Sequence, residues 1–287
     1  MKTAMLWLEA ARPKTLVLSI MPVLIGASFA ARQGTFSLLA CLMTFLTALL
    51  IQMGANFAND YYDFLKGADT AERKGPRRLT QAGLISLSQM KLAIFLTFSA
   101  VALMSIYLSA RGGPVFTLLT TLSIAFGILY TGGPKPLAYL GLGEVFVFLF
   151  FGPISTAGAA YLQTLTFSWE AVLLGLTPGF LASAVLVMNN LRDINEDKKA
   201  DKKTLTVRFG KKFTQVEYTV LICLGCLLPL TMGWWLSAFA LIPAIIPLKT
   251  VWRHIHVGEL NAALAQTAQV GLLTAALLAF GLLAHAV

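Results

Sequence analysis

Long apolar runs separated by short polar segments dominate the chain. A helix that crosses a lipid bilayer needs about 20 mostly apolar residues, and nine runs approach or reach that length. They cover residues 15–31, 36–58, 91–110, 114–131, 143–162, 169–190, 215–235, 237–252 and 265–286. The run at 237–252 is the weakest, because Pro243 and Pro247 interrupt it. We therefore expect an all-α, polytopic membrane protein in which about nine transmembrane helices form one domain over residues 1–287.

The composition agrees with this pattern and excludes a soluble globular protein. Of the 287 residues, 57% are hydrophobic and only 12% carry a charge, and the mean hydropathy is +0.75. Soluble domains carry about 25% charged residues, so we expect most of the surface to face lipid. The three cysteines, Cys41, Cys223 and Cys226, all fall inside apolar runs, where a small buried side chain is a commoner role than a redox pair.

The basic residues predict the orientation of the helices. The net charge is +9, and of the 22 Lys and Arg residues all but Arg32 and Arg111 precede the first helix or follow helices 2, 4, 6 and 8. Cytoplasmic connections of membrane proteins are rich in Lys and Arg. We therefore expect an inner-membrane protein with its N-terminus in the cytoplasm and its C-terminus outside. Because carboxylates are interleaved with these charges, they indicate a small anionic ligand rather than nucleic acid.

Acidic residues gather in two stretches, Asn56–Arg78 and Asn189–Gly210. Eight of the 13 acids lie there, namely Asp60, Asp63, Asp69, Glu72, Asp193, Glu196, Asp197 and Asp201. Each stretch begins where an apolar run ends, and Asn or Asp recurs at every fourth residue, which places these side chains on one face of a helix. Two similar segments four spans apart indicate a weak duplication around a shared central site.

The mixture of acids and bases in both stretches points to a metal–diphosphate site. Carboxylates at the mouth of a membrane helix are costly unless they are paired, hydrated or bound to a cation. Mg²⁺ typically binds one or two carboxylates together with phosphate oxygens and water. Such ions could bridge Asp63 and Asp193 or Asp197 to a diphosphate, while Lys and Arg contact its outer oxygens. A site of this kind stabilises diphosphate as a leaving group.

Three other interpretations compete with this one. A solvated charged loop does not explain why the acids are confined to two helix ends. A cation-coupled transporter with Asp63 and Asp193 as an ion relay would place its acids deep within the spans, whereas these lie beside basic connections. A CDP-alcohol phosphatidyltransferase would show a D-G…A-R…G…D-x3-D pattern, which is absent from the sequence.

Four segments resemble the UbiA-type membrane prenyltransferases. They are RPKT at 12–15, NDYYDFLKGAD with RKGPRR and GLIS at 59–86, YTGGPKPLAYLGLGE at 130–144, and NNLRDINED with KTLTVRFG at 189–210. Asn59-x3-Asp63 and Asp193-x3-Asp197 look like the two aspartate-rich motifs of that family. The finer match is to the 1,4-dihydroxy-2-naphthoate polyprenyltransferases of menaquinone synthesis. The last three helices add only their hydropathy.

The resemblance implies a fold and a reaction. The fold would be a helical bundle around a central cavity with a cytoplasmic, aspartate-rich mouth. The reaction would be Mg²⁺-dependent transfer of a polyprenyl group from polyprenyl diphosphate to 1,4-dihydroxy-2-naphthoate, with loss of CO₂ and diphosphate, to give demethylmenaquinol. Within the family, 4-hydroxybenzoate, homogentisate or haem is the alternative acceptor.

Site residues carry over from the family by position. The expected metal ligands are Asn59, Asp63, Asp69, Asp193 and Asp197. The residues expected at the reacting centre are Asp63, Tyr130, Lys135, Asp193 and Asp197, with Lys135 as the candidate for holding the acceptor's carboxylate. The residues expected to bind substrate are Asn59, Lys66, Arg73, Arg78, Glu144, Asn189, Arg192 and Lys202. Two positions depart from the family pattern, because Gly67 stands where relatives often have Asp, and Asp201 where they usually have Gly.

Overall fold

The described part of the chain is entirely helical. The computed structural model describes residues 2–67, 75, 77–253 and 257–285, and no strand occurs in these ranges. Two of the predicted site residues, Asp69 and Arg73, lie outside the described residues. Eight helical segments are long and apolar enough to cross a membrane, and a shorter apolar helix covers Val115–Leu129. The chain is therefore a multi-pass membrane protein, as its hydropathy predicts.

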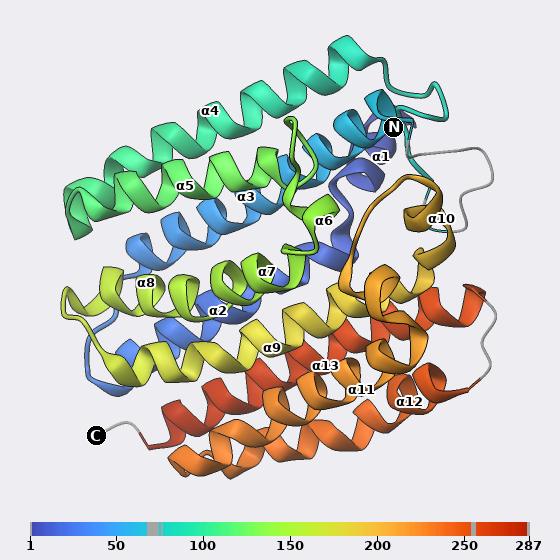
Figure 1. The fold of residues 1–287 in the computed structure, drawn as a ribbon. Coiled ribbons are helices and arrows are strands. Elements are labelled where there is room, and N and C mark those ends of the chain that lie inside the picture. The colour runs from blue at the N-terminus through green and yellow to red at the C-terminus, as the bar shows by residue number, and fades with distance from the viewer. Residues whose placement is uncertain (1, 68–74, 76, 254–256, 286–287) are drawn as a thin grey trace.

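Most of the helices run back and forth between the two ends of the molecule (Figure 1). In chain order they are α1 (Lys2–Ala11), α2 (Pro13–Arg32), α3 (Leu38–Leu65), α4 (Leu87–Gly112), α5 (Val115–Leu129), α6 (Leu137–Leu140), α7 (Gly143–Phe151), α8 (Pro153–Thr164), α9 (Trp169–Arg192), α10 (Ile194–Lys199), α11 (Leu205–Leu227), the 3₁₀ segments η1 (Leu228–Met232) and η2 (Trp235–Ala240), α12 (Leu241–Trp252) and α13 (Val257–Ala284). We call the end of the bundle that carries α1 and α10 the inner end. Since α13 finishes at the opposite end (Figure 1), the described chain crosses an odd number of times, and α5 supplies the ninth crossing.

The helices differ from the predicted spans mainly where polar residues continue them. The second predicted span stops at residue 58, whereas α3 continues to Leu65. The seventh was expected from residue 215, but α11 begins at Leu205 and bends at Gly210, whose φ is 80°. The span predicted at 143–162 is divided into α7 and α8 at Gly152. Hydropathy misses the added turns of α3 and α11 because they are polar and lie near the inner end rather than in lipid. It misses the break at Gly152 because this residue lies within an apolar run.

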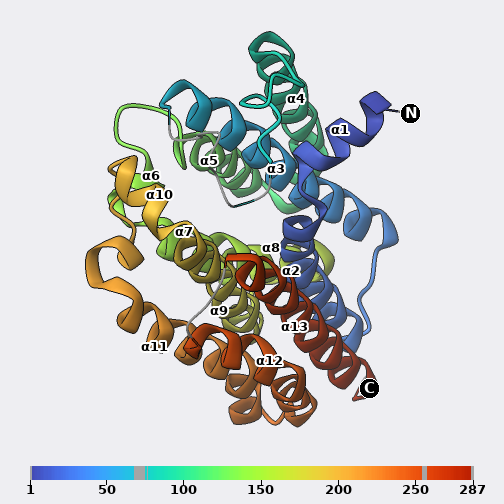
Figure 2. The ribbon, with the colours of Figure 1, turned by 90° about the vertical axis from the view of Figure 1, so that its right-hand side faces the viewer.

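Two groups of helices face each other across the middle of the bundle. In Figure 2, α3, α4 and α5 lie on one side and α9, α11, α12 and α13 on the other, with α2, α7 and α8 between them. Helix α2 packs against α3, α8 and α13, and α9 packs against α7, α8, α11 and α13. The largest hydrophobic core surrounds α2 and α9 and includes Met21, Ile25, Leu181 and Met188. Helix α2 therefore joins the two groups, and α9 attaches the second group to α7 and α8.

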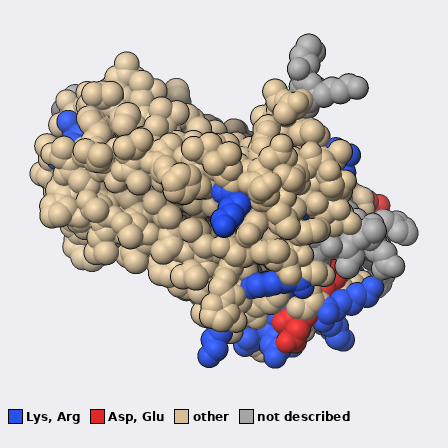
Figure 3. Space-filling model, turned by 90° about the horizontal axis from the view of Figure 1, so that it is seen from above, with Lys and Arg blue, Asp and Glu red and all other residues tan. Residues whose placement is uncertain are grey.

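Apolar side chains cover most of the outer surface. Leu103 of α4, Trp169 of α9 and Ile242 of α12 are 69%, 72% and 65% exposed. Extended apolar surface of this kind is rare on a protein surrounded by water. On the face in Figure 3, most of the Lys, Arg, Asp and Glu side chains gather toward one end, the inner end of Figure 1. This distribution fits helices that span lipid and connections that meet water.

The crossing of α2 and α8 depends on a glycine. A Cβ atom added to Gly26 would lie 2.6 Å from the carbonyl oxygen of Thr156 and 2.9 Å from the amide nitrogen of Ala160. Both are backbone atoms, so α8 itself would have to move. Small residues at such crossings allow membrane helices to approach closely.

We expect Gly26→Leu to destabilise the bundle, because the larger side chain must push α2 and α8 apart. Overpacking typically costs about 1–3 kcal/mol, so the melting temperature of the protein in detergent should fall by several degrees. Gly258→Ala is the matched control, since nothing lies within 4 Å of an added Cβ there. Equal melting temperatures for the two variants would show that stability does not need the close approach.

Candidate active site

A cavity of about 530 Å³ runs between the two groups of helices. Its lining begins with Asp63 and Asp193, at the inner ends of α3 and α9, and reaches Leu108 and Phe116, at the far ends of α4 and α5. The cavity therefore has a polar mouth at the inner end and extends along much of the length of the helices.

Beyond the mouth, the wall of the cavity is mostly apolar, although several hydroxyl groups lie in it. Thr44, Thr47, Thr120 and Ser123 line the cavity, and each donates its hydroxyl proton to a backbone carbonyl one turn earlier in its own helix. Hydroxyls used in this way do not need a partner in the cavity. Away from the mouth, most of the other lining side chains are Leu, Ile, Val, Phe and Ala, so this part of the wall fits an extended hydrocarbon.

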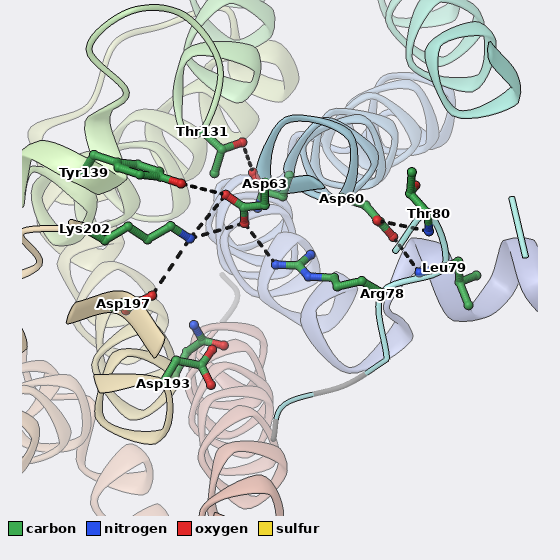
Figure 4. Close-up of polar contacts among 12 residues, drawn as sticks. Asp60, Asp63, Arg78, Leu79, Thr80, Thr131, Tyr139, Asp193, Asp197 and Lys202 are labelled. Atoms are coloured by element: carbon green, nitrogen blue, oxygen red, sulfur yellow. Dashed lines mark hydrogen bonds and ion pairs between the residues drawn. The ribbon is translucent and has the colours of Figure 1, made fainter. Parts of the chain in front are cut away.

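Asp63 is the centre of the polar mouth (Figure 4). The residue is 1% exposed, and its carboxylate accepts hydrogen bonds from Arg78 Nη2 at 3.2 Å and from Tyr139 Oη at 3.4 Å. Lys202 Nζ lies 3.2 Å from Asp63 Oδ1. These partners come from three different connections of the chain. A carboxylate buried this deeply needs them, because an uncompensated charge in a low dielectric is strongly destabilising.

Asp193 is paired by the residue that precedes it. Arg192 Nε and Nη2 lie 2.6 Å and 2.7 Å from the two carboxylate oxygens of Asp193. The same guanidinium donates to Asn189 Oδ1 at 2.7 Å and to Asn261 Oδ1 at 3.1 Å. Arg192 thus orients Asp193 and connects α9 with α13, a helix to which the sequence assigned no role at the site.

Lys202 joins the two aspartate clusters (Figure 4). Its Nζ lies 3.2 Å from Asp63 Oδ1 and 3.9 Å from Asp197 Oδ1, so one positive charge lies between carboxylates of α3 and α10. Among the described residues, no three Asp, Glu, His or Cys side chains are grouped closely enough to hold a metal ion by themselves. Mg²⁺ needs only one or two carboxylates when phosphate oxygens complete its coordination. The aspartates therefore fit a metal that binds together with an anionic ligand.

Other polar residues of α3 hold its surroundings in place. Asp60 accepts hydrogen bonds from the backbone N–H groups of Leu79 at 3.1 Å and Thr80 at 3.4 Å, which anchors the connection that carries the arginine at the mouth (Figure 4). Asn56 donates to the carbonyl oxygen of Ala11 at 2.8 Å and so fixes the corner between α1 and α2. These two residues are structural supports of the site.

The connection between α5 and α7, residues 130–142, borders the mouth next to Asp63. Lys66 donates to the carbonyl oxygen of Thr131 at 2.7 Å, and the Thr131 hydroxyl donates to Asn59 Oδ1 at 2.9 Å. The ammonium groups of Lys66 and Lys202 lie 4.8 Å and 5.1 Å from the centre of the Tyr139 ring, within the range of cation–π attraction. Burial lowers the pKa of the Lys66 ammonium. Lys66 therefore holds this connection against α3 rather than facing the cavity.

Most of the site residues predicted from the sequence line the cavity. They are Asn59, Asp63, Arg78, Tyr130, Asn189, Arg192, Asp193, Asp197 and Lys202. The lining does not include Lys66, Glu144 or Lys135. Lys135 follows the turn at Gly133, whose φ is 77°, and is exposed, so the structure does not bring it to the cavity. Glu144 is buried behind Asn190, whose Nδ2 donates to it at 2.7 Å.

Two residues at the site, Asn190 and Asn261, were not predicted from the sequence. Asn190 lies within the segments that carry the family resemblance, but it has no charge that would distinguish it. Asn261 lies in α13, for which only hydropathy was available. The only indication for Asn261 was a polar residue near the start of a largely apolar helix.

Comparison with known proteins agrees with this geometry. The sequence profile described as the UbiA prenyltransferase family matches residues 19–263. A 1,4-dihydroxy-2-naphthoate octaprenyltransferase of Escherichia coli K12 is 36% identical over 96% of this chain and 94% of its own. An enzyme of the same name from Haemophilus influenzae is 37% identical over 97% of this chain and 96% of its own.

Solved structures share the fold. A UbiA homologue from Archaeoglobus fulgidus, bound to GPP and Mg²⁺, covers 97% of this chain and 99% of its own with a TM-score of 0.70 and 16% identity. The apo structure of a UbiA homologue from Aeropyrum pernix K1 covers 93% of this chain and 97% of its own with a TM-score of 0.71 and 14% identity. The profile match covers most of the chain and the sequence relatives nearly all of it, so the chain belongs to the UbiA prenyltransferase family.

Proposed function

We propose that this chain, acting as one domain over residues 1–287, is a Mg²⁺-dependent polyprenyltransferase of menaquinone biosynthesis. It transfers a polyprenyl group from polyprenyl diphosphate to 1,4-dihydroxy-2-naphthoate, releases CO₂ and diphosphate, and gives demethylmenaquinol. The main support for the proposal is that two aspartate clusters lie together at the mouth of one apolar cavity, in a chain of this family. The naphthoate is supported by relatives of that name at 36% and 37% identity.

The two parts of the cavity suit the two parts of the donor. The diphosphate suits the mouth, where Asp63, Asp193 and Asp197 would hold Mg²⁺ and Arg78 and Lys202 are the cations available to the outer oxygens. When bound, the metal supplies positive charge that stabilises the diphosphate as it leaves. The hydrocarbon suits the apolar wall. A related protein bound to GPP and Mg²⁺ supports this assignment.

The transfer requires water to be excluded more than it requires a base. The bond between prenyl C1 and the diphosphate oxygen breaks, and its electron pair stays on the diphosphate. C1 then bonds to the ring carbon that bears the carboxylate. The bond to the carboxylate breaks as CO₂ leaves and returns its electron pair to the ring, so no proton is removed there. A largely apolar wall keeps water from the electron-poor C1, and the ring of Tyr130 in the lining can face its positive charge.

The acceptor is tested directly by offering the candidate acceptors to the protein in membranes. We expect prenyl transfer from polyprenyl diphosphate to labelled 1,4-dihydroxy-2-naphthoate, with release of CO₂, and little product from 4-hydroxybenzoate or homogentisate. The products are separated by chromatography and identified by mass. Transfer to 4-hydroxybenzoate instead of the naphthoate would replace the proposed acceptor.

The metal–diphosphate site is tested by removing its carboxylates. We expect Asp63→Ala and Asp193→Ala each to lower kcat/KM by about 10²–10³-fold or more, as for loss of a principal electrostatic stabiliser. The double variant should lose little more than either single variant, because residues that act as one unit are not additive. Activity of the unmodified protein should be lost in EDTA and return with Mg²⁺.

Asp201→Asn is the matched control for these variants. The carboxylate lies in the same acidic stretch, but its side chain is 86% exposed, so activity should change little. Normal turnover by Asp63→Ala, or by the unmodified protein in EDTA, would contradict the proposed site.

We further propose that the mouth faces the cytoplasm, the side from which the polyprenyl diphosphate is supplied. The positive charge of the inner connections supports this orientation. A cysteine introduced by Lys199→Cys in α10 should react with an impermeant reagent only in opened cells. One introduced by Thr166→Cys, between α8 and α9, should react in intact cells. Both positions are exposed, and the reverse labelling pattern would invert the topology.

A further inference from the structure

Asn190 lies on the cavity in the last turn of α9. Asp193, the residue that follows α9, and Asp197 of α10 also line the cavity. The amide of Asp193 still donates to the carbonyl oxygen of Asn189, so a rise of 1.5 Å per residue places Asn190 about 4.5 Å below Asp193 along the axis of α9. This level lies between the polar mouth and the apolar wall, where prenyl C1 must meet the acceptor ring.

The amide of Asn190 has a fixed orientation. Its Nδ2 donates to Glu144 Oε1 at 2.7 Å, and the two residues are 6% and 7% exposed. Glu144 is itself held in the first turn of α7, where its carbonyl oxygen accepts a hydrogen bond from Ser183 at 3.2 Å. Among the described residues, this bond to Glu144 is the one hydrogen bond that the structure gives to the Asn190 side chain. Because the nitrogen faces Glu144, the amide oxygen is directed away from it.

An amide oxygen in this place can only accept a hydrogen bond. The prenyl diphosphate has no hydrogen-bond donor for it, because the diphosphate oxygens only accept hydrogen bonds and the hydrocarbon neither donates nor accepts them. The adjacent Asn189 is not equivalent, since its oxygen already accepts from Arg192. We propose that the amide oxygen of Asn190, oriented by Glu144, accepts a hydrogen bond from the ring hydroxyl of the aromatic substrate and so selects hydroxylated rings. This proposal rests on the proposed function.

The contact also serves the reaction. A hydrogen bond donated by a ring hydroxyl increases electron density at the neighbouring ring carbon. In 1,4-dihydroxy-2-naphthoate the carbon that bears the carboxylate is next to the 1-hydroxyl. Asn190 therefore holds and activates the carbon that bonds to prenyl C1, while Glu144 is a positioning residue that does not touch the substrate.

The test compares two competitive inhibitors that differ only in the ring hydroxyl, 1-hydroxy-2-naphthoate and 2-naphthoate. We expect the unmodified protein to bind the hydroxy compound about 5- to 10-fold more tightly, the size of one net hydrogen bond. In Asn190→Leu, which keeps a similar volume, the ratio of the two inhibition constants should fall to about 1. The KM for polyprenyl diphosphate should stay nearly constant.

Two further variants separate selection from a purely structural role. Glu144→Gln keeps the size of the side chain but frees the amide orientation, so the inhibitor ratio should fall even if Asn190→Leu folds poorly. Ser183→Ala removes another hydrogen bond between α7 and α9 at a residue outside the cavity lining, and the ratio should stay at its original value.

The outcomes are distinguishable. Equal binding of the two inhibitors by the unmodified protein, or an unchanged ratio in both Asn190→Leu and Glu144→Gln, would overturn the role of Asn190. A fall of the ratio in Ser183→Ala as large as in Asn190→Leu would also overturn it, by assigning the effect to helix packing. If the unmodified protein forms no prenylated naphthoate at all, the proposed function itself fails.

Discussion

The charge of Asp63, buried at the inner end of α3, is the constraint on which the rest of the mouth depends. A carboxylate that is 1% exposed costs several kcal/mol unless cations and donors reach it. Arg78 and Lys202 come from the connections after α3 and after α10, so both connections must fold back over the mouth. Asp60 secures the first of them through the backbone of Leu79. The arrangement of the connections thus follows from the need to neutralise one side chain.

The same balance explains why metal and diphosphate suit the site together. Asp63, Asp193 and Asp197 are matched in the structure by Arg78, Arg192 and Lys202. A diphosphate alone would add negative charge beside three carboxylates, and a metal ion alone would add positive charge beside three cations. If both bind, the carboxylates would hold the metal and the cations would hold the phosphate oxygens, so every charge would keep an opposite neighbour.

The sequence predicts the helices and the helix face that carries Asn59 and Asp63, because both depend only on residues close together in the chain. Hydropathy finds the spans because lipid requires about 20 apolar residues, and four-residue spacing correctly groups Asn59 with Asp63. Local patterns do not show which connection folds over which helix. Lys135 was expected at the reacting centre from the family resemblance, whereas it lies after the turn at Gly133 and is exposed.

Long-range pairs were equally inaccessible to sequence reasoning. Glu144 was recognised as unusual because it is an acid at the start of an apolar run, yet its partner, Asn190, is 46 residues away on another helix. Arg192 was expected to bind substrate, whereas its guanidinium also joins Asp193 to Asn261, 69 residues further along the chain. Such pairs form only when distant helices pack against each other, so the sequence contains these residues but does not show that they come into contact.

The adjacent residues Asn189 and Asn190 show how one helix can serve both substrates. Successive residues of a helix point about 100° apart, so Asn189 turns toward Arg192 and the charged mouth, while Asn190 turns toward Glu144 and α7. Both side chains belong to α9, the most buried of the long helices, and Asp193 directly follows its last residue. With the proposed roles, the separation between the leaving diphosphate and the acceptor ring would be set by a rigid helix rather than by a loop. A reaction that joins two carbons needs such fixed spacing, because a small displacement of either partner removes most of the advantage of binding them together.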